Sequence, residues 1–267
     1  MPYEDILHEA KEGIATITIN RPKVYNAFRP KTIEELIQAF TEAGDDPEIG
    51  VIILTGAGDK AFCTGGDMNA WRVGEGYEGA SWAGIGLAVE RLHRLIRSVP
   101  KPVIAAVNGY AIGGGNVLQV LCDLAIASKT AVFGQVGPRV GSFDAGFGSA
   151  YLARLVGERK AREIWFLCRR YSADEALEMG LINRVVPHEQ LMVEANQWAN
   201  EMLDLSPTAL KALKYSFNAD TEHIAGITNL SMASVGLYYR TPESGEGHNA
   251  FKEKRPTNFR KFRKRGF

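Results

Sequence analysis

The chain has 267 residues, of which 45% are apolar and 23% are charged, and its 31 Lys and Arg balance 31 Asp and Glu. This composition excludes a disordered chain, a collagen-like repeat and a polycationic nucleic-acid binder. A chain of this length buries about 70 to 75% of its unfolded surface, so one large domain, or one domain with a smaller appendage, needs no disulfide or metal to hold it together.

The charge is unevenly distributed along the chain. Residues 252–267 carry eight Lys and Arg against the single Glu253, a local charge of +7, so the remaining residues sum to −7. A basic end of this kind is typical of a segment that meets nucleic acid, acidic lipid or a phosphorylated ligand, or of a solvated tail.

The cysteines and the apolar runs indicate the compartment. Cys63, Cys122 and Cys168 lie far apart without a CxxC pair, and no N-terminal stretch combines basic residues, an apolar core and a cleavage site. We therefore predict a cytoplasmic protein. No apolar run reaches 18 residues, so we predict no membrane span.

Strands and helices alternate from the N-terminus. Residues 14–20 alternate apolar and polar side chains, as in a half-buried strand, and Arg21-Pro22 ends the pattern. Apolar residues repeat at helical spacing over 31–43, and an uninterrupted apolar strand follows at 51–58. Strand, helix, strand is typical of an α/β fold.

The same pattern then repeats. We predict a helix over 86–98, a buried strand over 102–109, and an apolar helix that begins at the glycines 113–115. From residue 150 onward helical patterns dominate, and the predicted helices are 161–169, 173–180, 189–203 and 207–218. We predict an α/β core over 1–205 and a helical C-terminal region over 206–267.

Common catalytic motifs are absent. The sequence has no GxxxxGK[ST], HExxH or GxSxG, and its glycine triplet lacks the full GxGxxG spacing. The five His show no ligand spacing and are predicted to lie on the surface or in helix packing, so no metal site is expected. These histidines are His8, His93, His188, His223 and His248.

Two glycine-rich corners remain, Cys63–Asp67 and Gly109–Gly115, and each follows a buried-type strand. If the two strands are neighbours, two backbone N–H groups converge on one oxygen and stabilise an enolate or a tetrahedral oxyanion. Two tight turns, with Asp67 capping a helix, would explain the same residues.

Five ordered motifs resemble the crotonase (enoyl-CoA hydratase/isomerase) superfamily. They are NRPKVYNAF from Asn20, AFCTGGD from Ala61, KPVIAAVNGYAIGGG from Lys101, CDLAIAS from Cys122, and the stretch from Phe133 to Leu152. The resemblance implies a crotonase (ClpP-like) ββα superhelix with a C-terminal helical trimerisation domain, assembled as a homotrimer or homohexamer. It also implies an acyl-CoA substrate, with the thioester oxygen held by the N–H of Gly66 and of Gly114, with Gly113 adjacent.

The carboxylates of a hydratase are missing. Family hydratases carry one Glu two residues after the glycine triplet and a second Glu later, and these positions are Val117 and Gly137 here. Paired-carboxylate water addition to an enoyl double bond is therefore disfavoured.

The residues from Phe133 to Tyr151 are instead similar to two sibling activities. One is ring-opening by 2-ketocyclohexanecarboxyl-CoA hydrolase, and the other is ring closure by 1,4-dihydroxy-2-naphthoyl-CoA synthase. The resemblance implies a shared site of Ser142, Asp144 and Tyr239. Asp144 would activate water, Ser142 would donate to the alkoxide, and Tyr239 would protonate the enolate carbon. Local backbone hydrogen bonding by Ser142 and Asp144, and helix packing by Tyr239, are the alternatives.

Some synthases of this branch bind bicarbonate where Gly137 stands, using residues that match Gln135 and Trp165. Val136 replaces the Thr that usually follows the Gln, which removes a hydroxyl donor and counts against the ion. No other cofactor is expected.

The loop after the first corner differs from that of the synthases. Met68, Trp71 and Tyr77 predict an apolar pocket that fits a cyclic ketone. We therefore rank ring opening first and ring closure second. A noncatalytic CoA-binding subunit is a third possibility, which the retention of Ser142, Asp144 and Tyr239 disfavours.

The resemblance also assigns the contacts to substrate and CoA. The basic end would face the phosphates of CoA, so nucleic acid is no longer expected as a partner. The assigned residues are Tyr25, Ala61, Thr64, Gly65, Asp67, Met68, Tyr77, Tyr110, Gln135, Gly137, Trp165, Phe251 and Lys254. The Gly-rich loop 71–84 is expected to close on substrate.

Overall fold

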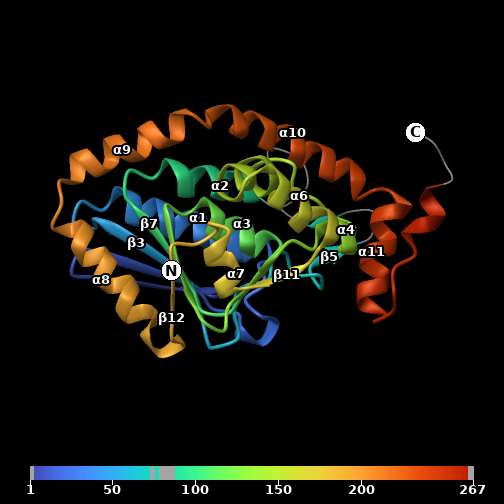
Figure 1. Ribbon diagram of the computed structural model, residues 1–267, viewed down its shortest axis with the longest axis horizontal. Helices are drawn as coiled ribbons and strands as arrows, with labels where there is room; N and C mark the ends of the chain where they lie inside the picture. The colour runs from blue at the N-terminus through green and yellow to red at the C-terminus, as the bar shows by residue number, and fades with distance from the viewer. Residues whose placement is uncertain (1–2, 73–75, 78–87, 264–267) are drawn as a thin grey trace.

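A six-stranded sheet forms the centre of the protein (Figure 1). The computed structural model describes residues 3–72, 76–77 and 88–263. The strand order of the sheet is β1 (Ile6–Lys11), β2 (Ile14–Ile19), β3 (Val51–Gly56), β7 (Val103–Val107), β9 (Leu124–Ser128) and β12 (Arg184–Val186). β1 and β2 form an antiparallel hairpin, and the other neighbours run parallel. The α/β prediction is confirmed.

A second, four-stranded sheet carries the two glycine corners. Its order is β11 (Arg170–Ser172), β10 (Val132–Gly134), β8 (Tyr110–Ile112) and β4 (Ala61–Cys63). β4 and β8 are parallel neighbours, with Ala61 opposite Tyr110. Both corners therefore leave the sheet at the same edge. The short antiparallel pair β5 (Trp71–Arg72) and β6 (Gly76–Tyr77) follows the first corner.

Helices cover both faces of the larger sheet. On one face Ile53 and Ile104 pack against α8 (Leu191–Leu203). Leu54 belongs to the larger cluster on the other face, beneath α1 (Pro30–Asp45), α2 (Val89–Ser98) and α3 (Gly114–Leu121). Because side chains alternate along a strand, the continuous apolar run of β3 serves both faces.

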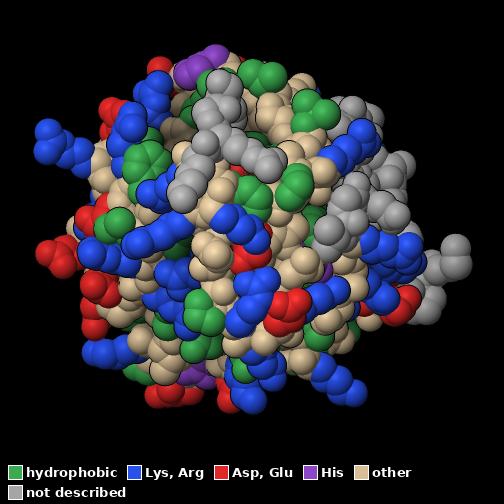
Figure 2. Space-filling model, turned by 90° about the vertical axis from the view of Figure 1, so that its right-hand side faces the viewer, with side chains coloured by type: hydrophobic (Ala, Val, Ile, Leu, Met, Phe, Trp, Pro, Cys, Tyr) green, Lys and Arg blue, Asp and Glu red, His purple; other side chains and the backbone are tan. Residues whose placement is uncertain are grey.

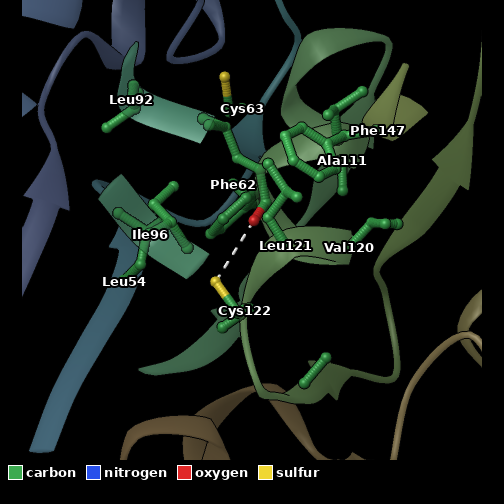
Figure 3. Packing of buried hydrophobic residues seen from close by; sticks show 14 of the residues in the cluster. Leu54, Phe62, Cys63, Leu92, Ile96, Ala111, Val120, Leu121, Cys122 and Phe147 are labelled. Atoms are coloured by element: carbon green, nitrogen blue, oxygen red, sulfur yellow. Dashed lines mark hydrogen bonds between the residues drawn. The ribbon is translucent and has the colours of Figure 1, made fainter. Parts of the chain in front are cut away.

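The larger cluster also includes Cys63 and Cys122 (Figure 3). Cys63, Cys122 and Cys168 are buried free thiols, and the Cys122 thiol donates to the Leu118 carbonyl at 3.3 Å. Burial raises the pKa of Cys63 to about 12, so this side chain stays a neutral thiol. The cysteines therefore act in packing.

The C-terminal helices wrap around the core in the order α9 (Pro207–Ala219), α10 (Glu222–Tyr238) and α11 (Pro242–Lys252) (Figure 1). α9 begins where Ser206 accepts the N–H of Ala209, just after the predicted division at 205. Lys214 of α9 is buried and its ammonium pairs with Asp123 at 2.7 Å. α10 packs on α2 and on the π-helix Phe147–Tyr151.

The remaining elements connect these layers. They are the 3₁₀ turns Pro22–Val24, His188–Gln190 and Phe259–Phe262, and the helices α4 (Gly137–Val140), α5 (Leu152–Val156), α6 (Glu158–Leu167) and α7 (Ala173–Glu178). None of the helices in the described ranges is long and apolar enough to cross a membrane. The predicted helix starting at 86 begins at Val89 in the described part, and residues 86–87 lie outside it.

Candidate active site

A cavity of about 760 Å³ opens where the glycine corners meet α2, α4 and the C-terminal end of α10. Most of the predicted site residues line it. They are Tyr25, Thr64, Gly65, Gly66, Asp67, Met68, Tyr77, Tyr110, Gly113, Gly114, Gln135, Gly137, Ser142, Asp144, Trp165, Tyr239 and Phe251. Ala61 and Lys254 lie outside this lining: Ala61 is buried in β4, and Lys254 is exposed after α11.

The two corners bring backbone donors together. Gly65 and Gly114 are so close that a Cβ on Gly65 would lie 2.9 Å from the Gly114 nitrogen. Phe28 bonds the residues on either side of Gly66, since it donates to Gly65 and accepts from Asp67, both at 2.8 Å. Among the described residues, the Gly66 N–H has no acceptor. Gly114 is the first residue of α3, so its N–H also lacks an intrahelical acceptor.

Gly113 does not supply a donor to this pair. Its N–H donates to the Gly134 carbonyl at 2.9 Å, which ties the corner to β10. Its φ of 57° and ψ of −124° suit glycine and turn the chain from β8 into α3. Gly113 therefore has a conformational role in the described structure, and Gly66 and Gly114 are the corner residues whose N–H groups are left without an acceptor there.

Asp67 holds the first corner in place. One carboxylate oxygen pairs with Arg21 at 2.9 Å, and the other accepts the Asn69 N–H at 2.9 Å. The side chain is 6% exposed. Asp67 therefore fixes a turn with a paired charge, and it is not free to act as a base.

Ser142 and Tyr239 come from distant parts of the chain and meet. Their oxygens are 2.8 Å apart. Burial raises the pKa of Tyr239, the Ser142 hydrogen bond opposes this, and the charge of Asp144 adds to the rise. The phenol therefore remains a proton donor at neutral and mildly alkaline pH.

Asp144 uses one carboxylate oxygen for local structure. Oδ1 accepts the N–H of Gly146 at 2.8 Å and of Gly148 at 3.1 Å, as a loop Asp commonly does. Oδ2 takes no hydrogen bond from the described residues. The carboxylate is thus held in position by one oxygen while the second remains available in the cavity.

The C-terminal helices hold both ends of the segment 141–146. Ser244 of α11 donates to the Gly141 carbonyl at 2.7 Å, and Ser231 of α10 accepts the Ala145 N–H at 2.8 Å. A Cβ on Gly141 would lie 2.3 Å from the Ser244 carbonyl oxygen, and its φ is 77°. Because this contact leaves no room for a side chain, Gly141 lets α11 support Ser142 directly.

The two positions that carry glutamates in hydratases also face the cavity. Val117 and Gly137 line it, and neither bears a carboxylate. In the described part of the lining, the carboxylates are those of Asp67 and Asp144. Since Asp67 is paired with Arg21, Asp144 is left as the candidate base.

The residues expected around bicarbonate do not fit that ion. The Trp165 N–H already donates to the Gly148 carbonyl at 2.6 Å. A Cβ on Gly137 would lie 2.7 Å from the Ser142 carbonyl oxygen and 3.0 Å from the Trp165 ring. Gln135 alone is open, because neither amide atom has a partner among the described residues. Trp165 therefore supports the Asp144 loop.

Aromatic side chains line part of the cavity. Trp71 is 4% exposed, and its ring packs edge-on against Tyr239 at 5.4 Å and tilted against His248 at 4.0 Å. A Cβ on Gly66 would lie 2.1 Å from the Tyr77 hydroxyl oxygen, so Tyr77 covers the first corner. The predicted apolar lining by Trp71, Met68 and Tyr77 is present. Most of the predicted closing loop, residues 73–75 and 78–84, lies outside the described residues.

The entrance carries cations that the sequence did not single out. Arg139 and Arg170 are exposed and line the cavity, and the Arg170 guanidinium lies over the Tyr110 ring at 5.6 Å. Tyr25 packs against Tyr110 at 6.2 Å. Arg170 and Tyr110 lie far apart in sequence and form no motif, because the parallel pairing of β8 with β10 and the antiparallel pairing of β10 with β11 bring them together.

The basic end is partly neutralised. Glu246 of α11 pairs with Arg255 at 2.7 Å and with Lys261 at 2.8 Å, and it accepts the Asn258 N–H. Lys and Arg side chains are spread over this end of the molecule (Figure 2). That the basic end faces the phosphates of CoA stays a prediction.

His93 is a cavity residue that the sequence analysis assigned to surface or helix packing. It lies on α2, is 2% exposed and lines the cavity. The sequence did not indicate that His93 lines the cavity, because His93 lies among apolar residues at helical spacing and that face of α2 meets both the core and the cavity.

Comparisons with known proteins agree with the fold. Three solved structures are similar over nearly the whole chain. They are an enoyl-CoA hydratase from Mycobacterium avium subsp. paratuberculosis (28% identity, 97% of this chain, 99% of that one, TM-score 0.85), one from Bacillus anthracis (31%, 96%, 99%, 0.73) and an enoyl-CoA hydratase/isomerase from Pseudoalteromonas atlantica (26%, 96%, 100%, 0.82).

The fold and the paired corners define an acyl-CoA enzyme of the crotonase superfamily. The enoyl-CoA hydratase/isomerase family matches residues 9–263, and the chain belongs to this family.

Proposed function

We propose that this protein opens the ring of a cyclic 2-oxoacyl-CoA, such as 2-ketocyclohexanecarboxyl-CoA, by hydrolysis of a C–C bond. The observation that carries the proposal is the placement of Asp144 and the Ser142–Tyr239 pair in one apolar cavity with the oxyanion hole. The two positions that would supply hydratase carboxylates are Val117 and Gly137, and neither residue carries a carboxylate. The site thus has the groups for enolate chemistry and lacks those for paired-carboxylate hydration.

The first step adds water to the ring ketone. Asp144 takes one proton from the water through Oδ2, and the water oxygen bonds to the ketone carbon. The carbonyl electron pair moves to its oxygen, to which the Ser142 hydroxyl donates. Because Oδ1 is fixed by Gly146 and Gly148, the base is oriented before substrate binds.

The second step breaks the ring. The carbonyl re-forms, the C–C bond breaks, and its electron pair moves into the thioester as an enolate. The N–H groups of Gly66 and Gly114 stabilise the enolate oxygen, and Tyr239 protonates the α-carbon. The product is an open-chain acyl-CoA with a terminal carboxyl group. The proton held by Asp144 balances the one given by Tyr239, so one water is consumed overall.

The test is a direct assay with 2-ketocyclohexanecarboxyl-CoA, following the loss of its enolate absorbance together with the appearance of the dicarboxylic product. Crotonyl-CoA hydration and naphthoyl-CoA formation from succinylbenzoyl-CoA are measured on the same preparation. Ring opening as the fastest reaction supports the proposal. Turnover only of succinylbenzoyl-CoA would replace it by ring closure, which the same enolate site can stabilise.

Substitution of Tyr239 by Phe removes the proton donor and the 2.8 Å hydrogen bond to Ser142. We expect kcat for ring opening to fall by about 10² to 10³-fold, because general-acid protonation contributes on this scale. Tyr238, which packs on Phe143 at 5.6 Å, gives the matched control Tyr238→Phe. Steady-state kinetics on both variants checks the assignment, and equal losses would contradict it.

We also propose that the protein assembles as a homotrimer or a dimer of trimers. Large apolar side chains are exposed on the outer faces of the C-terminal helices, among them Leu213, Phe217, Leu230 and Leu237. Burial of these side chains against a second copy would remove them from water. Light scattering after gel filtration is expected to give three or six times the chain's 29.3 kDa, and a monomer would contradict this.

A further inference from the structure

Arg21 joins the two chain segments that form the first glycine corner. One terminal nitrogen of its guanidinium donates to the Ala27 carbonyl, and the other pairs with the Asp67 carboxylate at 2.9 Å. The planar fork of an arginine is suited to binding two acceptors at once. Arg21 therefore ties the residue before Phe28 to the residue after Gly66.

Two peptide units lead from Arg21 to the Gly66 N–H. The Ala27 carbonyl that binds Arg21 belongs to the same peptide unit as the Phe28 N–H. That N–H donates to the Gly65 carbonyl at 2.8 Å, and this carbonyl shares its peptide unit with the Gly66 N–H. Because these units are trans and planar, the C=O and N–H of each point in opposite directions. Each hydrogen bond in the series therefore sets the direction of the next donor.

The series begins at a positive charge and ends at a free donor. Among the described residues the Gly66 N–H has no acceptor, and Gly66 lines the cavity. A cation at the head of a hydrogen-bonded chain polarises each peptide group along it, so the last N–H becomes a stronger donor. Gly66 begins no helix in the described part of the chain, whereas Gly114 is the first residue of α3. The positive charge behind the first corner thus comes from Arg21.

We propose that Arg21 is a positioning residue of the oxyanion hole, which directs and polarises the Gly66 N–H through the backbone of Ala27 and Phe28. This role rests on the oxyanion hole of the proposed function, and it holds for any thioester enolate formed there. Arg21 is not among the residues that line the cavity. Its effect falls on the hydrogen bond from Gly66 to the thioester oxygen, which is strongest when that oxygen carries negative charge. We therefore expect Arg21 to affect kcat more than KM.

The test compares Arg21→Lys with Arg29→Lys. A lysine keeps the positive charge, but its single ammonium replaces the fork that binds both Ala27 and Asp67. We expect Arg21→Lys to lower kcat about tenfold with KM changed less than about threefold, because the donor is displaced and not removed. Binding of the cyclohexylmethyl thioether of CoA, which has no thioester oxygen, is expected to be unchanged.

Arg29 is the matched control because it shares an acidic partner with Arg21. Its Nε binds the Asp5 carboxylate at 2.8 Å, and the Arg21 Nε faces the same carboxylate at 3.6 Å. The Arg29 side chain donates to Asp5 and Glu4, and among the described residues it donates neither to Ala27 nor to the corner. Arg29→Lys should therefore disturb the same ion-pair network and keep kcat near the wild-type value.

A double-variant cycle with Asp67→Asn tests whether the two side chains act together. Asp67→Asn keeps an oxygen for the Asn69 N–H and removes the charge that holds Arg21. If Asp67 acts by holding the guanidinium, Arg21→Lys adds little to the loss of kcat that Asp67→Asn already causes.

Wild-type kcat in Arg21→Lys, an equal loss in Arg29→Lys, or losses in the cycle that multiply fully would overturn this role of Arg21. A parallel loss of thioether binding would also overturn it, because the substitution would then have damaged the whole site. Absence of ring opening in the wild-type protein would overturn the proposed function alone, and the comparison is then made on crotonyl-CoA hydration or naphthoyl-CoA formation. Absence of all three reactions would overturn both.

Discussion

Replacement of Asp144 by Asn is expected to lower kcat for ring opening by about 10³-fold, within the range that general-base catalysis contributes. The amide keeps an oxygen for the N–H groups of Gly146 and Gly148, so the loop should stay folded. What is lost is the ability of the second oxygen to take a proton from water. Stopped-flow measurement of enolate absorbance gives the rate, and the melting temperature reports the fold.

Asp174→Asn is the matched control, because Asp174 is exposed in the first turn of α7 and is not among the residues that line the cavity. It should keep wild-type kcat. If Asp144→Asn also kept full C–C cleavage activity, the assignment of the base would be wrong, since no second unpaired carboxylate lies in the described lining.

Replacement of Gly114 by Ala is expected to lower kcat by about 10² to 10³-fold, the usual loss when one oxyanion donor is displaced. A Cβ there would lie 2.6 Å from the Phe28 ring and 3.4 Å from the Gly65 Cα. Phe28 is 4% exposed and bonded to the first corner through its backbone, so neither side can yield without moving a donor. The effect should be on kcat for every thioester substrate.

Gly226→Ala is the control for this change. Gly226 lies in α10 with open space around the position of a Cβ, so the variant should retain activity and gain up to about 1 kcal/mol of stability. Urea unfolding and steady-state kinetics on both variants check the comparison. Full activity of Gly114→Ala would show that the oxyanion hole lies elsewhere.

The names of the similar structures and the carboxylates of this chain point to different reactions. The solved structures from Mycobacterium avium and Bacillus anthracis are named enoyl-CoA hydratases. Under the proposed function, the pair of corners around Gly66 and Gly114 would stabilise a thioester enolate whatever forms it. Val117 and Gly137 line the cavity without a carboxylate, and we propose that Asp144 and Tyr239 supply the acid and base groups instead. On this proposal the fold would set the intermediate, and the side chains around it would select the reaction.

The sequence determined the α/β core, the two glycine corners and most of the cavity residues by itself. The reason is local: the buried strands are continuous apolar runs, and a chain that turns directly from a strand into a helix needs glycine where φ is positive, as at Gly113. The sequence alone also showed that the net charge of zero is the sum of a basic C-terminal segment and an acidic remainder of the chain.

Tertiary structure decided which groups are free to act. Only the fold shows that Asp67 is paired with Arg21, that the Trp165 N–H is engaged by Gly148, and that Glu246 neutralises part of the basic end. It also brought His93 into the cavity. These facts depend on contacts between residues far apart in sequence, and a hydrogen bond or an ion pair across such a distance leaves no periodic pattern in the chain.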